Sequence, residues 1–175
     1  MKSIGELETL LWKACARILF DVLKEPDRWI RWKHPTEGLP DWTTEDNVLF
    51  LNLAEHDDDY ARQRDSTYHG ERGIIIKRTA RTRVWELFCT AYGPRAYEIA
   101  NALRDGFFLI EIERLLGENA VFLVPDLPIC RQINESFAGS WWTRWDVAFH
   151  FNEQYTVTED AGRIERVSVA ISQNR

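Results

Sequence analysis

Strict alternation of side chains near the end of the chain constrains the fold more than any other feature. Trp145, Val147, Phe149 and Phe151 occupy every second position within residues 140–157. Smaller or polar side chains fill the positions between them. A period of two is the repeat of a β-strand, in which successive side chains point to opposite faces. The segment is therefore predicted to be a long strand of a sheet.

A turn and a second alternating segment follow this strand. Residues 159–162 have the composition of a turn, and Val167, Val169 and Ile171 then recur at every second position. Two alternating segments joined by a short turn are typical of a β-hairpin. We therefore expect the chain to reverse its direction at residues 159–162.

Two earlier segments also have strand patterns. Residues 48–54 are predicted to form a first strand, and residues 72–92 are rich in β-branched and aromatic side chains. The longer segment is predicted to be one long strand, or two strands joined by a bend near residues 78–81.

The beginning of the chain has the pattern of a helix. Apolar side chains recur every three or four positions over residues 3–24, which places them on one helical face. Ser3 and Glu6 have the spacing of a capping box, in which each side chain satisfies a free backbone N–H group. Pro26 disfavours helical geometry in the residue before it, so we expect the helix to end nearby.

The period changes again after the Gly93-Pro94 pair. Apolar side chains within residues 96–103 share one helical face. A second short helix is predicted over residues 107–116, with Gly117 as the glycine that follows its end.

These patterns predict the fold class. The length of 175 residues fits one domain with a substantial core, so we expect residues 1–175 to form a single domain. The fold class is α+β, with a mostly antiparallel sheet of about four strands and helices packed on one face.

Two segments lack a regular pattern. Residues 26–46 combine proline and glycine with three tryptophans set among arginine and lysine, and we expect a Trp-rich arm or loop. Three functions fit this segment: stacking on nucleic-acid bases, docking on a partner protein, or covering the first helix. Residues 55–70 are polar and include three consecutive aspartates, and we expect an exposed polar loop.

Composition and charge argue against several classes of protein. The net charge of −6 disfavours general binding to nucleic acid, which requires a positive field. The three cysteines show no C-x-x-C spacing and predict a reduced protein without a disulfide framework. No stretch resembles a signal peptide or has the roughly 20 apolar residues that a membrane span requires. The eight tryptophans and nine phenylalanines favour a protein that assembles with others.

The signatures of common catalytic and metal sites are missing from the sequence. No two of the histidines stand two or four positions apart, so no zinc site is predicted; they are His34, His56, His69 and His150. The aspartate run lacks the glycine and glutamate of a calcium loop, and no glycine-rich phosphate loop occurs. A small hydrolase using His150 would require a nucleophile that no motif marks. We predict neither an enzyme nor a bound metal or cofactor.

Two motifs carry a resemblance to a known family. They are Tyr92-Gly93-Pro94-Arg95-Ala96 and a strand that contains Trp141, Arg144, Asp146 and Phe151-Asn152-Glu153. In order and spacing they resemble the neck-terminator family of tailed bacteriophages. Its members carry a Tyr-Gly-x-x-Ala element and a Trp-x-x-Arg-x-Asp…Phe-Asn-Glu strand. The similarity covers most of the chain.

The resemblance implies a structural protein of the virion with a tail-terminator-like fold, assembled in the host cytoplasm. Such subunits form rings, commonly hexamers, which cap the tail tube and join it to the connector under the head. The resemblance thus implies contacts with other copies of the chain, with tail tube and sheath proteins, and with the connector or collar protein. It also implies a lumen through which DNA passes without specific binding. A negative net charge fits such a lumen. Neither a cofactor nor a membrane is implied.

Large aromatic side chains and the charged loop are the candidate contacts between subunits or with partners. These residues are Trp29, Trp32, Trp42, Asp57, Asp58, Asp59, Arg62, Arg64, Trp141 and Trp142. Two other functions stay open. One is a head-side collar or connector (head-completion) protein in about twelve copies. The other is a nucleic-acid-binding module that uses the Trp-rich segment and has salt-sensitive affinity for DNA.

Overall fold

The computed structural model describes residues 2–33, 42–71, 74–137 and 139–163. Its helices are α1 (Ile4–Ile18), α2 (Pro26–Trp29), α3 (Asp59–Arg62), α4 (Ala96–Gly106) and α5 (Ile110–Gly117). Its strands are β1 (Ile30–Trp32), β2 (Val48–Glu55), β3 (Asp65–Glu71), β4 (Ile74–Tyr92), β5 (Val121–Leu123), β6 (Arg131–Gln132), β7 (Glu135–Phe137), β8 (Ser140–Trp142) and β9 (Arg144–Arg163).

One mixed, mostly antiparallel sheet dominates the fold, which confirms the α+β class. The order of its strands is β1-β2-β4-β9-β5, with β3 also paired to β4 and β6 also paired to β9. Among the described residues the sheet thus has seven strands rather than about four, and β7 and β8 form a separate pair. The prediction was too low because β1, β5 and β6 contain only two or three residues each. Such short edge strands leave no alternation to recognise.

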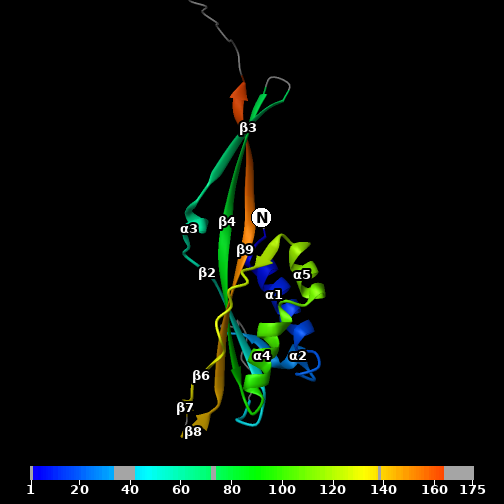
Figure 1. Cartoon of the computed structure of the whole chain (residues 1–175), viewed down its shortest axis with the longest axis vertical. Coiled ribbons are helices and arrows are strands. Elements are labelled where there is room, and N and C mark those ends of the chain that lie inside the picture. The colour runs from blue at the N-terminus through cyan, green and yellow to red at the C-terminus, as the bar shows by residue number, and fades with distance from the viewer. Residues whose placement is uncertain (1, 34–41, 72–73, 138, 164–175) are drawn as a thin grey trace, which may run out of the picture.

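Two long antiparallel strands form the centre of the sheet. β4 has 19 residues and pairs with β9, which has 20, along almost its whole length. Figure 1 shows them running side by side through most of the molecule. Leu87 lies opposite Phe149 in this register, so both alternating sets bury the same face. The prediction of one long strand over residues 72–92 is confirmed from residue 74 onward.

Helices cover one face of the sheet, but only along part of its length. α1, α4 and α5 gather on one side of β4 and β9 (Figure 1). Their buried side chains form one core with those of the strands. Phe107, which follows α4, lies at the centre of this core, with its ring centroid 4.6 Å from that of Phe149 and 5.3 Å from that of Phe151.

The predicted capping box begins α1. The backbone N–H of Glu6 donates to the Ser3 hydroxyl at 3.2 Å, and the Ser3 N–H donates to the Glu6 carboxylate at 2.7 Å. The helix ends at Ile18, earlier than the predicted residue 24. Pro26 instead occupies the start of α2, where its missing N–H costs no hydrogen bond.

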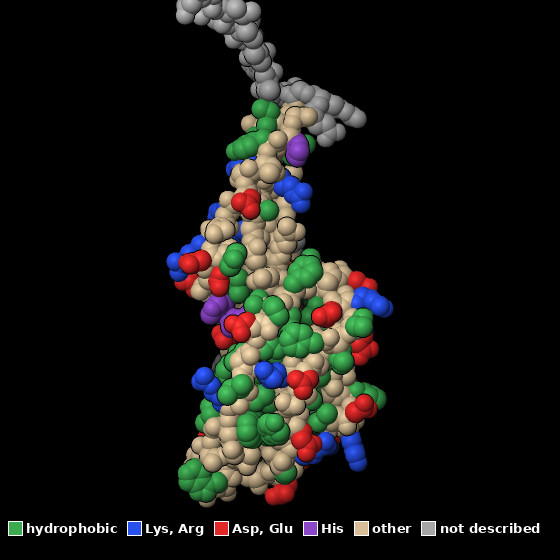
Figure 2. Space-filling view, in the orientation of Figure 1, with side chains coloured by type: hydrophobic (Ala, Val, Ile, Leu, Met, Phe, Trp, Pro, Cys, Tyr) green, Lys and Arg blue, Asp and Glu red, His purple; other side chains and the backbone are tan. Residues whose placement is uncertain are grey.

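A three-stranded ribbon projects beyond the helices, and we call it the arm. It is distinct from the Trp-rich segment of residues 26–46. It consists of β3, residues 74–80 of β4 and residues 156–163 of β9. Figures 1 and 2 show it as a slender extension of the broader half that carries the helices. Residues 65–70 and 157–162 are exposed. The arm therefore adds almost nothing to the core of its own chain.

The predicted turn at residues 159–162 is wrong. β9 continues straight through these residues, and its register with β4 shifts by one position between Ile75 and Ile76. The Asp160 carboxylate accepts the N–H of Gly162, whose φ is +110°. This β-bulge uses the same residue types as a turn, because glycine supplies a positive φ and aspartate bonds the backbone two residues on. The predicted strand that contains Val167 lies outside the described residues.

Both segments predicted to be irregular contain secondary structure. Residues 26–46 include α2 and β1, and β1 pairs in parallel with β2. Residues 34–41 of this segment lie outside the described part of the chain. The segment 55–70, predicted as a loop, contains α3 and most of β3, although β3 is exposed as expected. A strand with two exposed faces carries no apolar alternation and therefore escapes detection in the sequence.

Candidate functional site

An aromatic cleft opens on the face of the sheet that the helices leave uncovered. Trp42 is its centre, with ring centroids 4.6 Å from Trp142, 5.1 Å from Tyr92 and 5.6 Å from Phe50. The cleft has a volume of about 530 Å³. The described residues that line it are Lys33, Trp42, Phe50, Thr90, Tyr92, Glu135, Trp142 and Arg144. Of the predicted contact residues, the structure thus brings Trp42 and Trp142 together.

Polar side chains at the rim of the aromatic cleft are bonded to one another. The Tyr92 hydroxyl donates to Glu135 at 2.8 Å, and Arg144 lies 3.3 Å from the same carboxylate. Burial, followed by the bond to Glu135, raises the pKa of Tyr92 to about 12. The hydrogen bond from Tyr92 is the main cause of a lowered pKa at Glu135. Tyr92 therefore stays neutral and Glu135 ionised near neutral pH.

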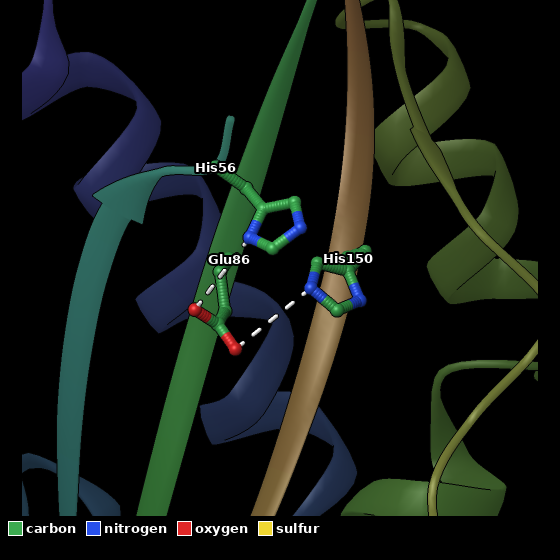
Figure 3. A group of neighbouring side chains, drawn as sticks. All are labelled: His56, Glu86 and His150. Atoms are coloured by element: carbon green, nitrogen blue, oxygen red, sulfur yellow. Dashed lines mark ion pairs between the residues drawn. The ribbon is translucent and has the colours of Figure 1, made fainter. Parts of the chain in front are cut away.

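A second group of side chains lies on the same face, where the arm joins the broader half. Figure 3 shows the His56 and His150 rings next to each other, with the Glu86 carboxylate facing a nitrogen of each. Glu86 on β4 lies directly opposite His150 on β9, and His56 immediately follows β2. We call these three residues the histidine cluster. The sequence did not predict it, because its members are distant in the chain.

The arm carries a shallow groove of about 460 Å³ on the face that continues the helix-covered side of the sheet. Lys77 and Glu159 form an ion pair across it at 2.7 Å, and the other lining residues are Arg64, Ser66, Thr79, Arg81, Tyr155 and Val157. Both charge signs and apolar surface occur together there.

Two cysteines of the core are unsuited to nucleophilic catalysis. Cys15 and Cys89 are free thiols buried among apolar side chains. Burial, followed by a hydrogen bond with Cys15, raises the pKa of the Cys89 thiol well above its usual value. Since the thiolate is the reactive form, both cysteines act as small apolar side chains.

Comparison with known families decides the identity. The family of phage neck terminator proteins matches residues 6–175. The chain belongs to this family. A search of curated proteins finds no match. Neck terminators are structural proteins of the phage particle and contact other head and tail proteins, so the chain is a component of the virion.

The first neck-terminator motif forms a turn that only glycine fits. Gly93 has a φ of +106°, and a Cβ atom on it would lie 2.2 Å from the Asp46 carbonyl oxygen. The Asn47 side chain accepts the N–H of Arg95 at 2.7 Å, which holds the start of α4 to the loop before β2. The motif thus joins the sheet to its covering helix.

The second neck-terminator motif supplies ion pairs to β9. Arg144 makes a bidentate pair with Asp146, at 2.8 and 2.7 Å. Glu153 accepts hydrogen bonds from Arg83 at 2.6 Å and from the Trp85 indole at 3.0 Å, all three residues being buried. These motif residues therefore have structural roles.

The remaining predicted contact residues are scattered over the molecule. Trp29 and Trp32 are partly buried and pack against the core. Trp141, on β8, is 75% exposed. Arg64 lines the groove of the arm, at the opposite end of the sheet from the aromatic cleft.

The aspartate run is paired within its own chain. Arg62 donates its Nε–H to Asp57 at 2.9 Å and lies 3.9 Å from Asp59. The Asp58 carboxylate caps α3 by accepting the N–H of Tyr60. The predicted contact of this loop with a neighbouring subunit therefore competes with existing pairs. None of the helices in the described residues is long and apolar enough to cross a membrane.

Proposed function

We propose that this neck terminator forms a ring of about six subunits at the junction of the tail tube and the head connector. The arm is the observation that carries the proposal. Ribbons of a few strands require a packed face for stability, and most of the arm has none within its own chain. A neighbouring subunit supplies that contact.

Tyr68 and Val157 mark the face of the arm that is available for this contact. Tyr68 lies opposite Lys77, and Val157 lies opposite Thr79, so both point to the side of the groove. Their exposed fractions are 61% and 40%. In a closed ring each subunit presents different surfaces to its two neighbours. The arm is one of these surfaces.

The mass of the full chain in solution, with negative-stain images of the same sample, tests the ring. We expect closed rings of about six copies, or monomers that form rings on addition of tail tubes. The double substitution Tyr68→Glu/Val157→Glu should abolish rings and leave the circular dichroism spectrum unchanged, because it places charge on an apolar contact. Phe20→Glu is the matched control, since Phe20 is 70% exposed but follows α1, away from the arm.

Three outcomes would contradict this function. A ring of about twelve copies would place the protein on the head side, as a collar protein. A stable monomer that ignores both tail tubes and connector assemblies would refute the structural role in the neck. Rings that persist in the doubly substituted arm variant would show that the arm is not the contact.

We further propose that the ring binds the tail tube and sheath on one side and the connector on the other, with the genome passing through its lumen. Trp141, a predicted contact residue with an exposed side chain on β8, belongs to one of these surfaces, whereas Arg64 belongs to the arm. The net charge of −6 supports a lumen from which DNA is repelled.

A DNA-shift assay is a direct test of such a lumen. We expect no shift of double-stranded DNA by the full chain at about 50 mM salt, where contacts with phosphates are strongest. A shift that weakens steeply with added salt would contradict the proposal. Loss of such a shift in a Trp29→Ala/Trp32→Ala variant would instead support the nucleic-acid-binding alternative.

A further inference from the structure

We propose that the histidine cluster binds a divalent transition-metal ion of the zinc class. Two imidazoles and one carboxylate form a common ligand set for Zn²⁺ and related ions. The ligand atoms of His56, Glu86 and His150 all lie within 4.8 Å of one another. Nothing in the neck terminator role requires such a site, so the proposal stands independently of that role.

The distances within the histidine cluster favour a bridging ion over direct contacts. Nδ1 of His56 lies 4.0 Å from one Glu86 oxygen, and Nε2 of His150 lies 3.8 Å from the other. These separations exceed the 2.7–3.2 Å of ordinary hydrogen bonds to nitrogen. The carboxylate thus lies at ion-pair distance from both rings but makes a hydrogen bond with neither of them.

The second observation is an unsatisfied nitrogen. Nε2 of His150 is buried and has no hydrogen-bond partner among the described residues. A buried polar atom without a partner is destabilising, so native structures rarely retain one. This nitrogen points toward the Glu86 carboxylate (Figure 3). A metal ion between them would supply its missing partner.

Small movements suffice to complete the metal site. Tetrahedral Zn²⁺ with bonds of about 2.1 Å holds its ligand atoms about 3.4 Å apart. The three ligand atoms therefore need to approach one another by at most about 1.4 Å, which rotation of partly exposed side chains provides. A fourth position stays open for water or for a group from another protein.

The backbone already holds the ligands in place. The His56 N–H donates to the Val84 carbonyl at 2.8 Å, which ties the residue after β2 to β4. The Val124 N–H donates to the His150 carbonyl at 2.8 Å, which fixes β9 on its other side. A bound ion would thus join β2, β4 and β9 on the uncovered face of the sheet, behind the core that Phe149 and Phe151 form with the helices.

Calorimetric titration of the full chain with ZnCl₂ tests the metal site, after removal of any affinity tag. We expect one Zn²⁺ per chain and a higher thermal midpoint with zinc. His56→Ala and His150→Ala should each weaken binding at least tenfold, because even changes to residues that only orient the ligands cost about 10–100-fold. Excess Mg²⁺ should not displace the zinc, since imidazole is a poor ligand for it.

His69→Ala is the matched control, because His69 is an exposed histidine on β3 of the arm. It should bind zinc as the native chain does. Glu86→Gln preserves size and fold and should also weaken binding, which guards against loss of zinc through misfolding. Absence of zinc binding by the native chain would overturn the proposal, and so would His56→Ala and His150→Ala variants that bind zinc as tightly as the native chain.

Co²⁺ bound in place of zinc should give the intense visible absorption of a tetrahedral site. The spectrum of the hydrated ion would refute that geometry.

Discussion

We expect the Arg83→Met substitution to lower the free energy of unfolding by about 3–5 kcal/mol. The guanidinium donates to Glu153 at 2.6 Å, and the two side chains are only 10% and 5% exposed. Removal of one partner leaves the other charge buried without compensation. Glu153→Gln should be similarly costly, although glutamine still accepts the hydrogen bond of the Trp85 indole.

The double variant Arg83→Met/Glu153→Gln distinguishes the cost of an unpaired buried charge from the cost of lost packing. It removes both charges and preserves an acceptor for Trp85, so its stability should exceed that of either single variant. Unfolding in denaturant, followed by circular dichroism, measures all three. Lys77→Met breaks an exposed pair with Glu159 and should change little. Single variants that lose less than about 1 kcal/mol, or fully additive losses in the double variant, would contradict the expectation.

Phe107→Ala is expected to be equally damaging, with a loss of about 3–5 kcal/mol. The Phe107 side chain has no exposed surface and contacts the rings of Phe149 and Phe151. Truncation would remove apolar contacts and leave a cavity between the helices and β9. The midpoint of denaturant unfolding should fall accordingly.

Phe108→Ala is the matched control for this substitution. Phe108 is the next residue along the chain, but its side chain is 46% exposed. Exposed positions usually change stability by less than about 0.5 kcal/mol. Equal losses at the two positions would mean that the helices do not pack on β9 through Phe107.

Long amphipathic segments were predictable from the sequence because one face of each is buried in the same core. The alternation of Phe149 and Phe151 identified β9, and residues 72–92 identified β4. The capping box of Ser3 and Glu6 located the start of α1 without any tertiary information. In each case a local pattern and the tertiary environment require the same side chains.

Two sets of predictions failed for different physical reasons. Residues 159–162 suit both a turn and a bulge, and only the pairing of β9 with the far end of β4 selects the bulge. β3 has two exposed faces, and β1 has three residues, so neither produces a periodic pattern. Elements that depend on neighbouring strands for stability have the weakest periodic pattern in the sequence.

By itself the sequence determined the fold class, the two long strands, the helices that cover them and the neck terminator family. These follow from patterns within short windows and from motifs whose spacing is local. Only the tertiary structure decided which distant residues meet, as in the aromatic cleft around Trp42 and in the histidine cluster of His56, Glu86 and His150. The reason is physical: strand register sets which side chains are neighbours across a sheet, and register depends on the whole core rather than on any one segment.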